Sequence, residues 1–369
     1  MRALLHLLGE LLWRFVRSLD LPLLAALLAI MGIGLATLFS ASNESSRVLL
    51  TQGAYFAVGL GALWVASRVP AHLLKQLTPA IFALSMLPLV LVLFIGRGKY
   101  GNHWIDLGFF NLQPSELAKL SLPMMLAWYL DRQRLPPRLR VLAGAALILA
   151  LPVGLILLQR DFGTSVLVLA AGMFVLFLAG LSWWWFAAAA AAVSAIAPVA
   201  WFWLLRPYQK DRILTFLDPE SDPMGAGWNI IQSKIAIGGG GLAGKGWGHG
   251  TQSHLNYVPE HTTDFIFAVL SEEFGWIGVA VVLGLYLFVV ARCLWLAADS
   301  RDGYARLVTG ALGLSLFVYV LVNGGMVSGL LPVVGVPMPL LSYGGTAPVT
   351  LLTGFGVVMA LKARRPVHR

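Results

Sequence analysis

The chain has 369 residues, of which 58% are hydrophobic and only 12% are charged, and its mean hydropathy is +0.79. Soluble domains carry about 25% charged residues, so this composition excludes a soluble globular enzyme and is typical of a protein that crosses the membrane repeatedly. The net charge is +9, but the basic residues are scattered between apolar runs, which argues against a nucleic acid as partner.

The sequence opens with a segment that mixes apolar and basic side chains. Residues 4–19, LLHLLGELLWRFVRSL, carry leucine, tryptophan and phenylalanine together with Arg14 and Arg17 at roughly helical spacing. This pattern predicts an amphipathic segment within residues 1–20 that lies on the cytoplasmic membrane surface. A frayed tail is the alternative.

Ten apolar runs follow, each about as long as a membrane-spanning helix requires, which is about 20 residues. They cover Leu21–Ala41, Val48–Ala66, Ala71–Ile95, Pro114–Tyr129, Val141–Leu158, Phe162–Gly180, Trp183–Leu205, Asp264–Leu296, Tyr304–Met326 and Thr346–Leu361. Because the runs are continuously apolar rather than alternating, we expect helices and not a barrel. The predicted fold is an all-α, polytopic integral membrane protein: one membrane domain over residues 1–369, with a large extracytoplasmic loop at residues 206–263.

The distribution of basic residues predicts the orientation, because cytoplasmic loops carry an excess of lysine and arginine. With the N-terminus inside, the inner segments hold 16 of the 26 basic residues, and five of the nine outer ones lie in the long loop. We therefore expect a multi-pass protein of the cytoplasmic (inner) membrane with both termini in the cytoplasm. Most carboxylates then fall near the outer face, so any chemistry is expected there.

The first polar constellation is GNHWIDLGFFNLQPSELAK, residues 101–119. Pro114 is typical of a first helical position, and Gln113 is expected to cap this helix. Lys119 follows Glu116 by three residues, which places both side chains on one helical face. Either the two charges only neutralise each other, or Lys119 meets an anion in an outward-facing cavity.

Two further segments lie at the predicted outer face. In QRDFGTS, residues 159–165, Asp161 either solvates the interface or lies at the mouth of a cavity. In the long loop, apolar residues recur at helical spacing within WNIIQSKIAI, which predicts a short amphipathic helix. The glycines around Lys245 match the first part of a phosphate-binding loop, but Gly246 follows where a hydroxyl is required and no strand precedes. A mobile glycine loop is the preferred interpretation.

The loop ends in YVPEHTTDFIFAVLSEEFGWIG, residues 257–278. Thr262 or Thr263 is expected to cap a helix beginning near Asp264, where the helix dipole would stabilise a carboxylate. The polar run before Asp264, at the entrance of a span, favours a functional role instead. Glu272 is expected about 12 Å deeper along the helix, where it could face the same cavity.

The last polar constellation is NGGMVSGLLPVVGVPMPLLSYGGTAP, residues 323–348. Glycines and prolines interrupt it too often for a regular helix. Irregular backbone at membrane depth must be buried in protein or line a polar cavity, so this segment is expected to shape a site.

Together these segments resemble the SEDS family (shape, elongation, division and sporulation), which comprises the RodA and FtsW polymerases. The resemblance covers essentially the whole chain, and GTQSHLNYVPEHTTDF looks more like the elongation members than the division members. His103 departs from the arginine that the family usually has before Trp104. The resemblance implies a peptidoglycan glycosyltransferase that joins lipid II into glycan strands on the outer face of the membrane during elongation and rod-shape maintenance. It also implies release of undecaprenyl pyrophosphate and partnership with a class B penicillin-binding protein.

The resemblance also assigns roles to residues. Asp264 matches the family's essential loop aspartate and is predicted to be the general base or a ligand of a divalent ion, Mg²⁺ or Mn²⁺, although no metal signature is present. It is expected to open onto a pocket large enough for two lipid-linked sugars. The candidates for binding pyrophosphate are Lys119, Arg206, Lys210 and Arg212. The residues expected to support the cavity are Trp104, Glu116, Asp161, Glu260, His261, Thr263 and Ser342.

Two other functions remain open from the residues. A lipid II flippase would also have intramembrane charges, but it requires a polar path through the inner half of the membrane, whereas the acidic residues here gather outside. A noncatalytic scaffold for a crosslinking enzyme would tolerate changes at Asp264.

Overall fold

The computed structural model describes residues 19–97, 103–106, 108, 111–204, 207–221, 227–254 and 260–362. The side chains of residues 204, 208, 209, 212, 221, 253 and 254 are outside this description. The amphipathic segment predicted at residues 4–19 falls outside these ranges apart from Leu19.

The described part of the chain is almost entirely helical, and ten of its helices coincide with the ten predicted spans. They are α2 (Leu21–Ala41), α3 (Ser46–Arg68), α4 (Ala71–Ile95), α5 (Pro114–Asp131), α6 (Leu139–Leu158), α7 (Phe162–Leu178), α8 (Trp183–Val199), α12 (Ile266–Asp299), α13 (Gly303–Val327) and α14 (Thr346–Leu361). Except at the C-terminal end of α8, which the π-helical turn η1 (Ala200–Leu204) continues, the ends agree with the predicted ends within three residues. The all-α, multi-pass fold is confirmed.

The remaining elements lie in the two long connections. The loop before α5 contains a two-stranded antiparallel sheet, β1 (Ile105–Asp106) with β2 (Asn111–Leu112), in which Ile105 pairs with Leu112. The loop before α12 contains α9 (Pro207–Leu217), the 3-10 turn η2 (Pro219–Ser221), α10 (Trp228–Gly239) and α11 (Thr251–His254). Helix α10 is the predicted amphipathic helix, whereas the sheet and α9 were not expected.

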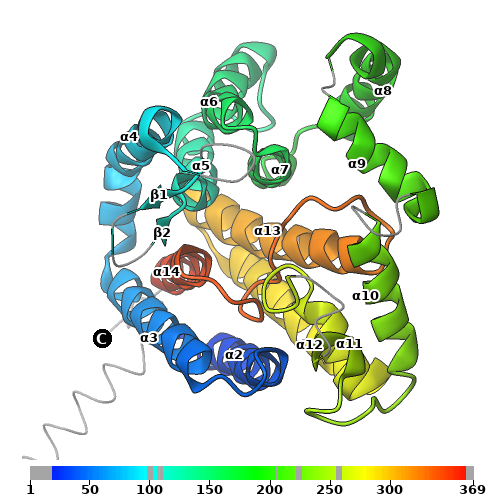
Figure 1. Ribbon diagram of the computed structural model, residues 1–369. Coiled ribbons are helices and arrows are strands. Elements are labelled where there is room, and N and C mark those ends of the chain that lie inside the picture. The colour runs from blue at the N-terminus through cyan, green and yellow to red at the C-terminus, as the bar shows by residue number, and fades with distance from the viewer. Residues whose placement is uncertain are drawn as a thin grey trace, which may run out of the picture.

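Two apolar clusters hold the bundle together. One joins α2 and α3 to α12, α13 and α14, and the other joins α4, α5, α6 and α7 to α13 and α14. Figure 1 shows α14 in the middle of the bundle, between α3 on one side and α5 and α13 on the other. In contrast, α8 and α9 lie at the margin, and no residue of α8 is buried. The segment between α13 and α14 is irregular, as expected, and its residues Val336, Met338 and Leu340–Ser342 are buried.

Helices α2 and α12 run antiparallel and are tied at both ends by polar contacts. At one end the Asp20 carboxylate accepts hydrogen bonds from Arg292 (Nε 3.0 Å, Nη2 2.8 Å), and at the other end the Ser40 hydroxyl donates to Glu273. Trp276 and Trp295 of α12 are 61% and 53% exposed. They lie 19 residues apart, which at 1.5 Å per residue is about 28 Å, close to the thickness of a bilayer core. The segment Trp276–Trp295 therefore has the length and the flanking tryptophans that are typical of a membrane span.

Helix α12 is broken at Gly275, whose φ of 62° and ψ of −162° are not helical. The glycine-rich loop (residues 240–250) docks into this break. Lys245 and Gly246 donate their N–H groups to the carbonyls of Glu272 and Glu273 (3.0 Å each), and the N–H of Trp276 donates to the carbonyl of Gly241 (3.0 Å). A Cβ atom on Gly244 would lie 2.1 Å from the carbonyl oxygen of Glu273, so only glycine permits this approach.

This docking corrects one expectation. The glycine-rich loop is a packed element rather than a mobile connection. Glu272 and Glu273 precede the break, and Glu273 lies at the Ser40 end of α2.

Candidate active site

Asp264 lies in a turn, Glu260–Phe265, which leads into α12. The helix begins at Ile266 with Phe265 as its N-cap residue, and no side chain caps it. The expected cap by Thr262 or Thr263 is therefore wrong: the Thr263 hydroxyl donates to Glu260 instead (2.9 Å to Oε2). Because Asp264 precedes the first helical turn, stabilisation by the helix dipole does not explain its position.

Three hydrogen bonds hold the backbone of this turn against the segment between α13 and α14. Ser342 donates its hydroxyl to the carbonyl of Thr263 (2.6 Å), and Tyr343 donates its N–H to the carbonyl of Thr262 (2.9 Å). The third bond runs from the Asn323 amide on α13 to the carbonyl of Asp264 (2.8 Å). Hydrogen bonds from α13 and from the segment between α13 and α14 thus fix the backbone of the Asp264 turn.

The carboxylate of Asp264 has no such support. Burial, followed by repulsion from Glu260, raises the pKa of Asp264 to about 6. Among the described residues, no group donates a hydrogen bond to this carboxylate. Its Oδ2 faces Gly335, where a Cβ atom would lie 3.5 Å away. A half-buried carboxylate with a raised pKa and free lone pairs has the properties of a general base near neutral pH.

Lys119 and Glu116 form the predicted pair on one face of α5, with Nζ and Oε1 2.5 Å apart and both side chains mostly buried. Lys119 also lies over the ring of Tyr319 on α13, 4.8 Å from its centroid. The pair and Tyr319 line a cavity of about 90 Å³ that also includes Ser342. The ion pair is therefore confirmed and it lines a cavity, whereas contact of Lys119 with an anion stays a prediction.

Asp264 is not among the residues that line this cavity, so the large pocket expected beside Asp264 stays a prediction. Ligand sites for drug-sized molecules occupy about 300–1,000 Å³, so a volume of about 90 Å³ admits water or one polar group but not lipid-linked sugars. Ser342 connects the Lys119 cavity with the Asp264 turn, since it lines the cavity and donates to the carbonyl of Thr263.

Asp161 and Gln113 meet across two elements at the edge of this region. Asp161 is the N-cap of α7, where its side chain accepts from the N–H of Thr164 (3.0 Å). Gln113 does not cap α5 with its side chain, as had been expected, but donates to Asp161 (3.3 Å). Trp104 pairs with Arg97 in an isolated β-bridge outside the Lys119 cavity. Glu260 is exposed, while His261 is half-buried beside Asp264 in the turn.

Of the other predicted pyrophosphate ligands, the structure describes the side chain of Lys210. Lys210 of α9 lies 5.9 Å from the ring centroid of Trp201 in η1, in the part of the molecule formed by α8 and α9 at its margin, and it does not line the Lys119 cavity. Arg206 and the side chain of Arg212 lie outside the described residues.

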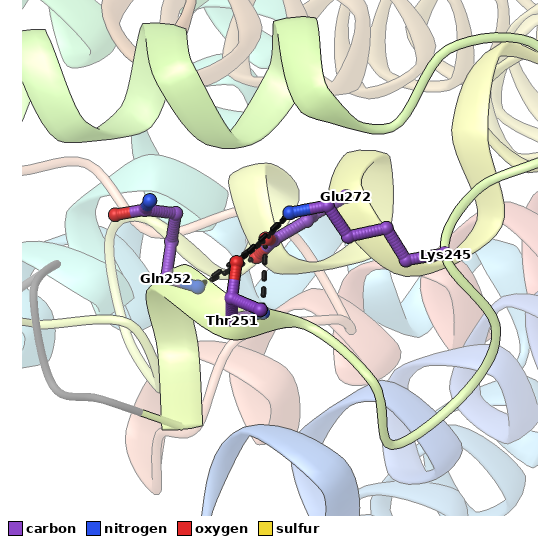
Figure 2. A network of polar contacts seen from close by, with 4 residues as sticks. All are labelled: Lys245, Thr251, Gln252 and Glu272. Carbon is purple, nitrogen blue, oxygen red and sulfur yellow. Dashed lines mark hydrogen bonds and ion pairs between the residues drawn. The ribbon is translucent and has the colours of Figure 1, made fainter.

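Glu272, which is expected from the helix geometry to face a cavity together with Asp264, is fully buried, and neither residue lines the Lys119 cavity. Figure 2 shows Glu272 at the centre of a polar network that anchors the glycine-rich loop and α11. Its Oε1 accepts from Lys245 Nζ (2.6 Å) and from the N–H of Thr251 (2.9 Å), and its Oε2 accepts from the N–H of Gln252 (3.2 Å). Glu272 is a structural carboxylate.

The described residues around Asp264 do not form a ligand set for a divalent ion. Among the described residues, no three His, Cys, Asp or Glu side chains converge as metal ligands. Mg²⁺ and Mn²⁺ require several oxygen ligands, and around Asp264 only Glu260 is a neighbouring carboxylate in the turn. We therefore derive no chemical step through a metal.

Comparison with known proteins identifies the family. A model for the FtsW, RodA and SpoVE proteins, described as cell cycle protein, matches residues 13–366. The chain belongs to this family. It is 45% identical to the peptidoglycan glycosyltransferase MrdB of Escherichia coli K12, over 94% of each chain. A solved structure titled for the coordination of polymerization and crosslinking by a peptidoglycan synthase complex contains a chain with a TM-score of 0.82 and 34% identity, covering 93% of this chain and 97% of that one.

Solved structures of RodA are also similar to this chain. A mutant of Thermus thermophilus RodA in which an aspartate is replaced by alanine matches with a TM-score of 0.72 and 29% identity, covering 93% of this chain and 97% of that chain. The similarity to the SEDS family predicted from the motifs is thus confirmed along the whole chain.

Sequence reasoning missed one residue of the site, Asn323. It was noted only as the start of the irregular segment, whereas the structure buries it completely inside α13 beside Asp264. The signal in the sequence is a lone amide within the apolar C-terminal part of α13, because a buried polar group requires a partner.

Proposed function

We propose that this chain polymerises peptidoglycan glycan strands, joining lipid II disaccharides on the extracytoplasmic face of the cytoplasmic membrane and releasing undecaprenyl pyrophosphate. Its family membership supports the reaction class, since MrdB carries the name peptidoglycan glycosyltransferase over almost the same length. The observation that carries the mechanism is the Asp264 carboxylate, which is half-buried, has a pKa near 6 and accepts no described hydrogen bond.

In this proposal, Asp264 accepts the proton of the acceptor sugar's hydroxyl as that oxygen attacks the anomeric carbon of the donor. The bond from the anomeric carbon to the pyrophosphate oxygen breaks, and the configuration inverts. General-base help is worth about 10²–10⁴ in rate. A pKa near 6 suits this role, because the group is ionised at neutral pH and is still basic enough to take a proton.

Lys119 is proposed to supply positive charge on the leaving-group side. Its pairing with Glu116 and its position over Tyr319 hold the ammonium group at the small cavity rather than in bulk solvent. The cavity would admit one polar group, such as a phosphate oxygen, while the prenyl chain remains in the lipid. Arg206, Lys210 and Arg212 remain candidates for contacts from the long loop.

The proposed partner is a class B penicillin-binding protein, which would crosslink the strands. Support comes from the matching chain in the peptidoglycan synthase complex, whose title joins polymerization to crosslinking. The proposed orientation, with both termini in the cytoplasm, rests on the excess of basic residues in the inner segments.

The test is an assay of the purified chain, alone and with its partner, on lipid II in detergent or vesicles without ATP or an ion gradient. The proposal predicts glycan strands longer than the disaccharide with wild-type protein and their loss with Asp264→Asn. Transfer of lipid II across vesicles without any strand would favour the flippase. Full strand synthesis by Asp264→Asn would refute the assignment of the base, and if only the partner makes strands the scaffold is correct.

A further inference from the structure

Asn323 joins three segments that surround the Asp264 carboxylate. It lies near the end of α13 and is completely buried. Its Nδ2 donates two hydrogen bonds, one to the carbonyl of Asp264 (2.8 Å) and one to the carbonyl of Val336 (2.7 Å). A single side chain thus connects the turn before α12, helix α13 and the irregular segment before α14.

The geometry fixes the orientation of this amide. Both neighbours are carbonyl oxygens, which only accept, so the NH₂ group must face them. The Oδ1 atom is then buried without a hydrogen-bond partner among the described residues. A buried unsatisfied acceptor destabilises a fold by about 1–3 kcal/mol. An apolar side chain of similar shape would remove that penalty but would leave the carbonyls of Asp264 and Val336 without their donor, so the role of asparagine at this position lies in these two hydrogen bonds.

The hydrogen bond from Asn323 to Val336 holds the backbone segment that faces the Asp264 carboxylate. Val336 follows Gly335, and a Cβ atom on Gly335 would lie 3.5 Å from Oδ2 of Asp264. Gly335 has a φ of 71°, a conformation that other residues rarely adopt. Asn323 therefore sets the position of both the residue that bears the carboxylate and the backbone that the carboxylate faces.

Ser342 makes a similar bridge, from Met338 to Thr263, but it does not bond to Asp264 or Val336, and Met338 lines the Lys119 cavity. Among the described side chains, Asn323 is the one that bonds to the main chain on both sides of the carboxylate.

We propose that Asn323 is a positioning residue for glycan polymerisation: its two hydrogen bonds hold Asp264 and Gly335 at the separation that admits the acceptor hydroxyl to the carboxylate. This inference rests on the proposed function. It requires that loss of the bonds slows the chemical step more than it weakens substrate binding or the fold, because a misplacement of about 1 Å can reduce a rate about 100-fold.

The test compares Asn323→Leu and Asn323→Asp with the wild type in the lipid II assay, using detergent-purified full chain with its partner. The leucine variant keeps the volume and removes both donors, and the aspartate variant keeps the shape and can donate at most one bond, only when protonated. The matched control is Ser233→Ala, which removes a buried bond between α10 and the carbonyl of Val327 (2.8 Å) away from the Asp264 turn.

We expect kcat to fall about 10- to 100-fold in Asn323→Leu and to fall clearly in Asn323→Asp, with KM for lipid II within about twofold of the wild type. Asn323→Leu removes the donor to two buried carbonyls and Ser233→Ala the donor to one, so the thermal midpoint of the leucine variant should fall by no more than about twice the fall in Ser233→Ala, whose kcat should match the wild type. If the leucine variant does not fold, the isosteric aspartate variant decides the question by the same measurements.

Two results overturn the inference while leaving the proposed function intact. One is an unchanged kcat in the folded Asn323 variants when Asp264→Asn is inactive in the same assay. The other is a rise in KM that alone accounts for the loss of activity. If Asp264→Asn itself polymerises lipid II at the wild-type rate, the proposed base fails, and the positioning role fails with it.

Discussion

Asp20 and Asp264 are carboxylates at opposite ends of the bundle, and their surroundings differ. Asp20 caps α2 by accepting from the N–H of Leu23 (3.1 Å), and it is paired with Arg292 (2.8 Å) and Lys362 (3.0 Å). Asp264 has its main chain fixed, but no described donor reaches its carboxylate. The carboxylate of Asp20 joins helices, whereas the carboxylate of Asp264 is free to accept a hydrogen bond or a proton from a ligand.

The two pKa values move in opposite directions for this reason. Burial alone would raise the pKa of Asp20, but its bonds to Arg292, Lys362 and Leu23 outweigh burial and hold the pKa below its usual value. Burial raises the pKa of Asp264 to about 6 and Glu260 adds to the shift, and no cation among the described residues opposes it. Partners, and not burial, therefore separate a structural carboxylate from a reactive one in this protein.

The largest effect on stability is expected at Asp20. Asp20→Asn leaves the charges of Arg292 and Lys362 without their partner, and breaking a buried ion pair by removing one member costs about 3–5 kcal/mol. The free energy of unfolding, measured by chemical unfolding in detergent, should fall by that amount, and the remaining folded protein should polymerise normally. The control is Asp106→Asn, which breaks the exposed pair with Arg97 (3.3 Å) and should change stability by less than about 1 kcal/mol.

Glu272 tests whether the end of the bundle or the hydrogen-bond partners decide the role of a carboxylate. It lies at the same end as Asp264, but like Asp20 it is bonded to several donors. Glu272→Gln weakens its contacts with Lys245, Thr251 and Gln252, and hydrogen bonds to charged groups are worth about 1.5–3 kcal/mol. We expect a loss of stability in that range and faster hydrogen exchange in the glycine-rich loop. Unchanged exchange in that loop would show that the docking into the break at Gly275 does not depend on this carboxylate.

The smallest expected effect on stability is that of Asp264→Asn, and its sign is informative. Because the pKa of Asp264 is raised, the folded state binds this proton more tightly than the unfolded chain, and ionisation between about pH 3.8 and 6 works against folding. At pH 8 the asparagine variant should therefore unfold at the same temperature as the wild type or slightly above it. A clear decrease would mean that the carboxylate has stabilising partners and resembles Asp20 after all.

The spans could be predicted from the sequence because each is a continuous apolar run of the length that a bilayer requires. The ion pair of Glu116 with Lys119 followed from their spacing on one helix. The break at Gly275 and the docking of the glycine-rich loop could not be foreseen, because they depend on backbone hydrogen bonds between segments about 30 residues apart. The same holds for Asn323, whose role depends on two carbonyls from other segments.

The most direct test of the account is the rate of lipid II polymerisation by wild-type and Asp264→Asn protein, with partner, between pH 5 and 8. If Asp264 is the base, the wild-type rate is constant above about pH 7 and falls toward tenfold per unit below about pH 6, where the carboxylate is protonated. The variant should be about 10²–10⁴ slower at pH 8 and should lack this acidic decline. A variant that polymerises as fast as the wild type, or that is slower but declines at the same pH, would contradict the central claim.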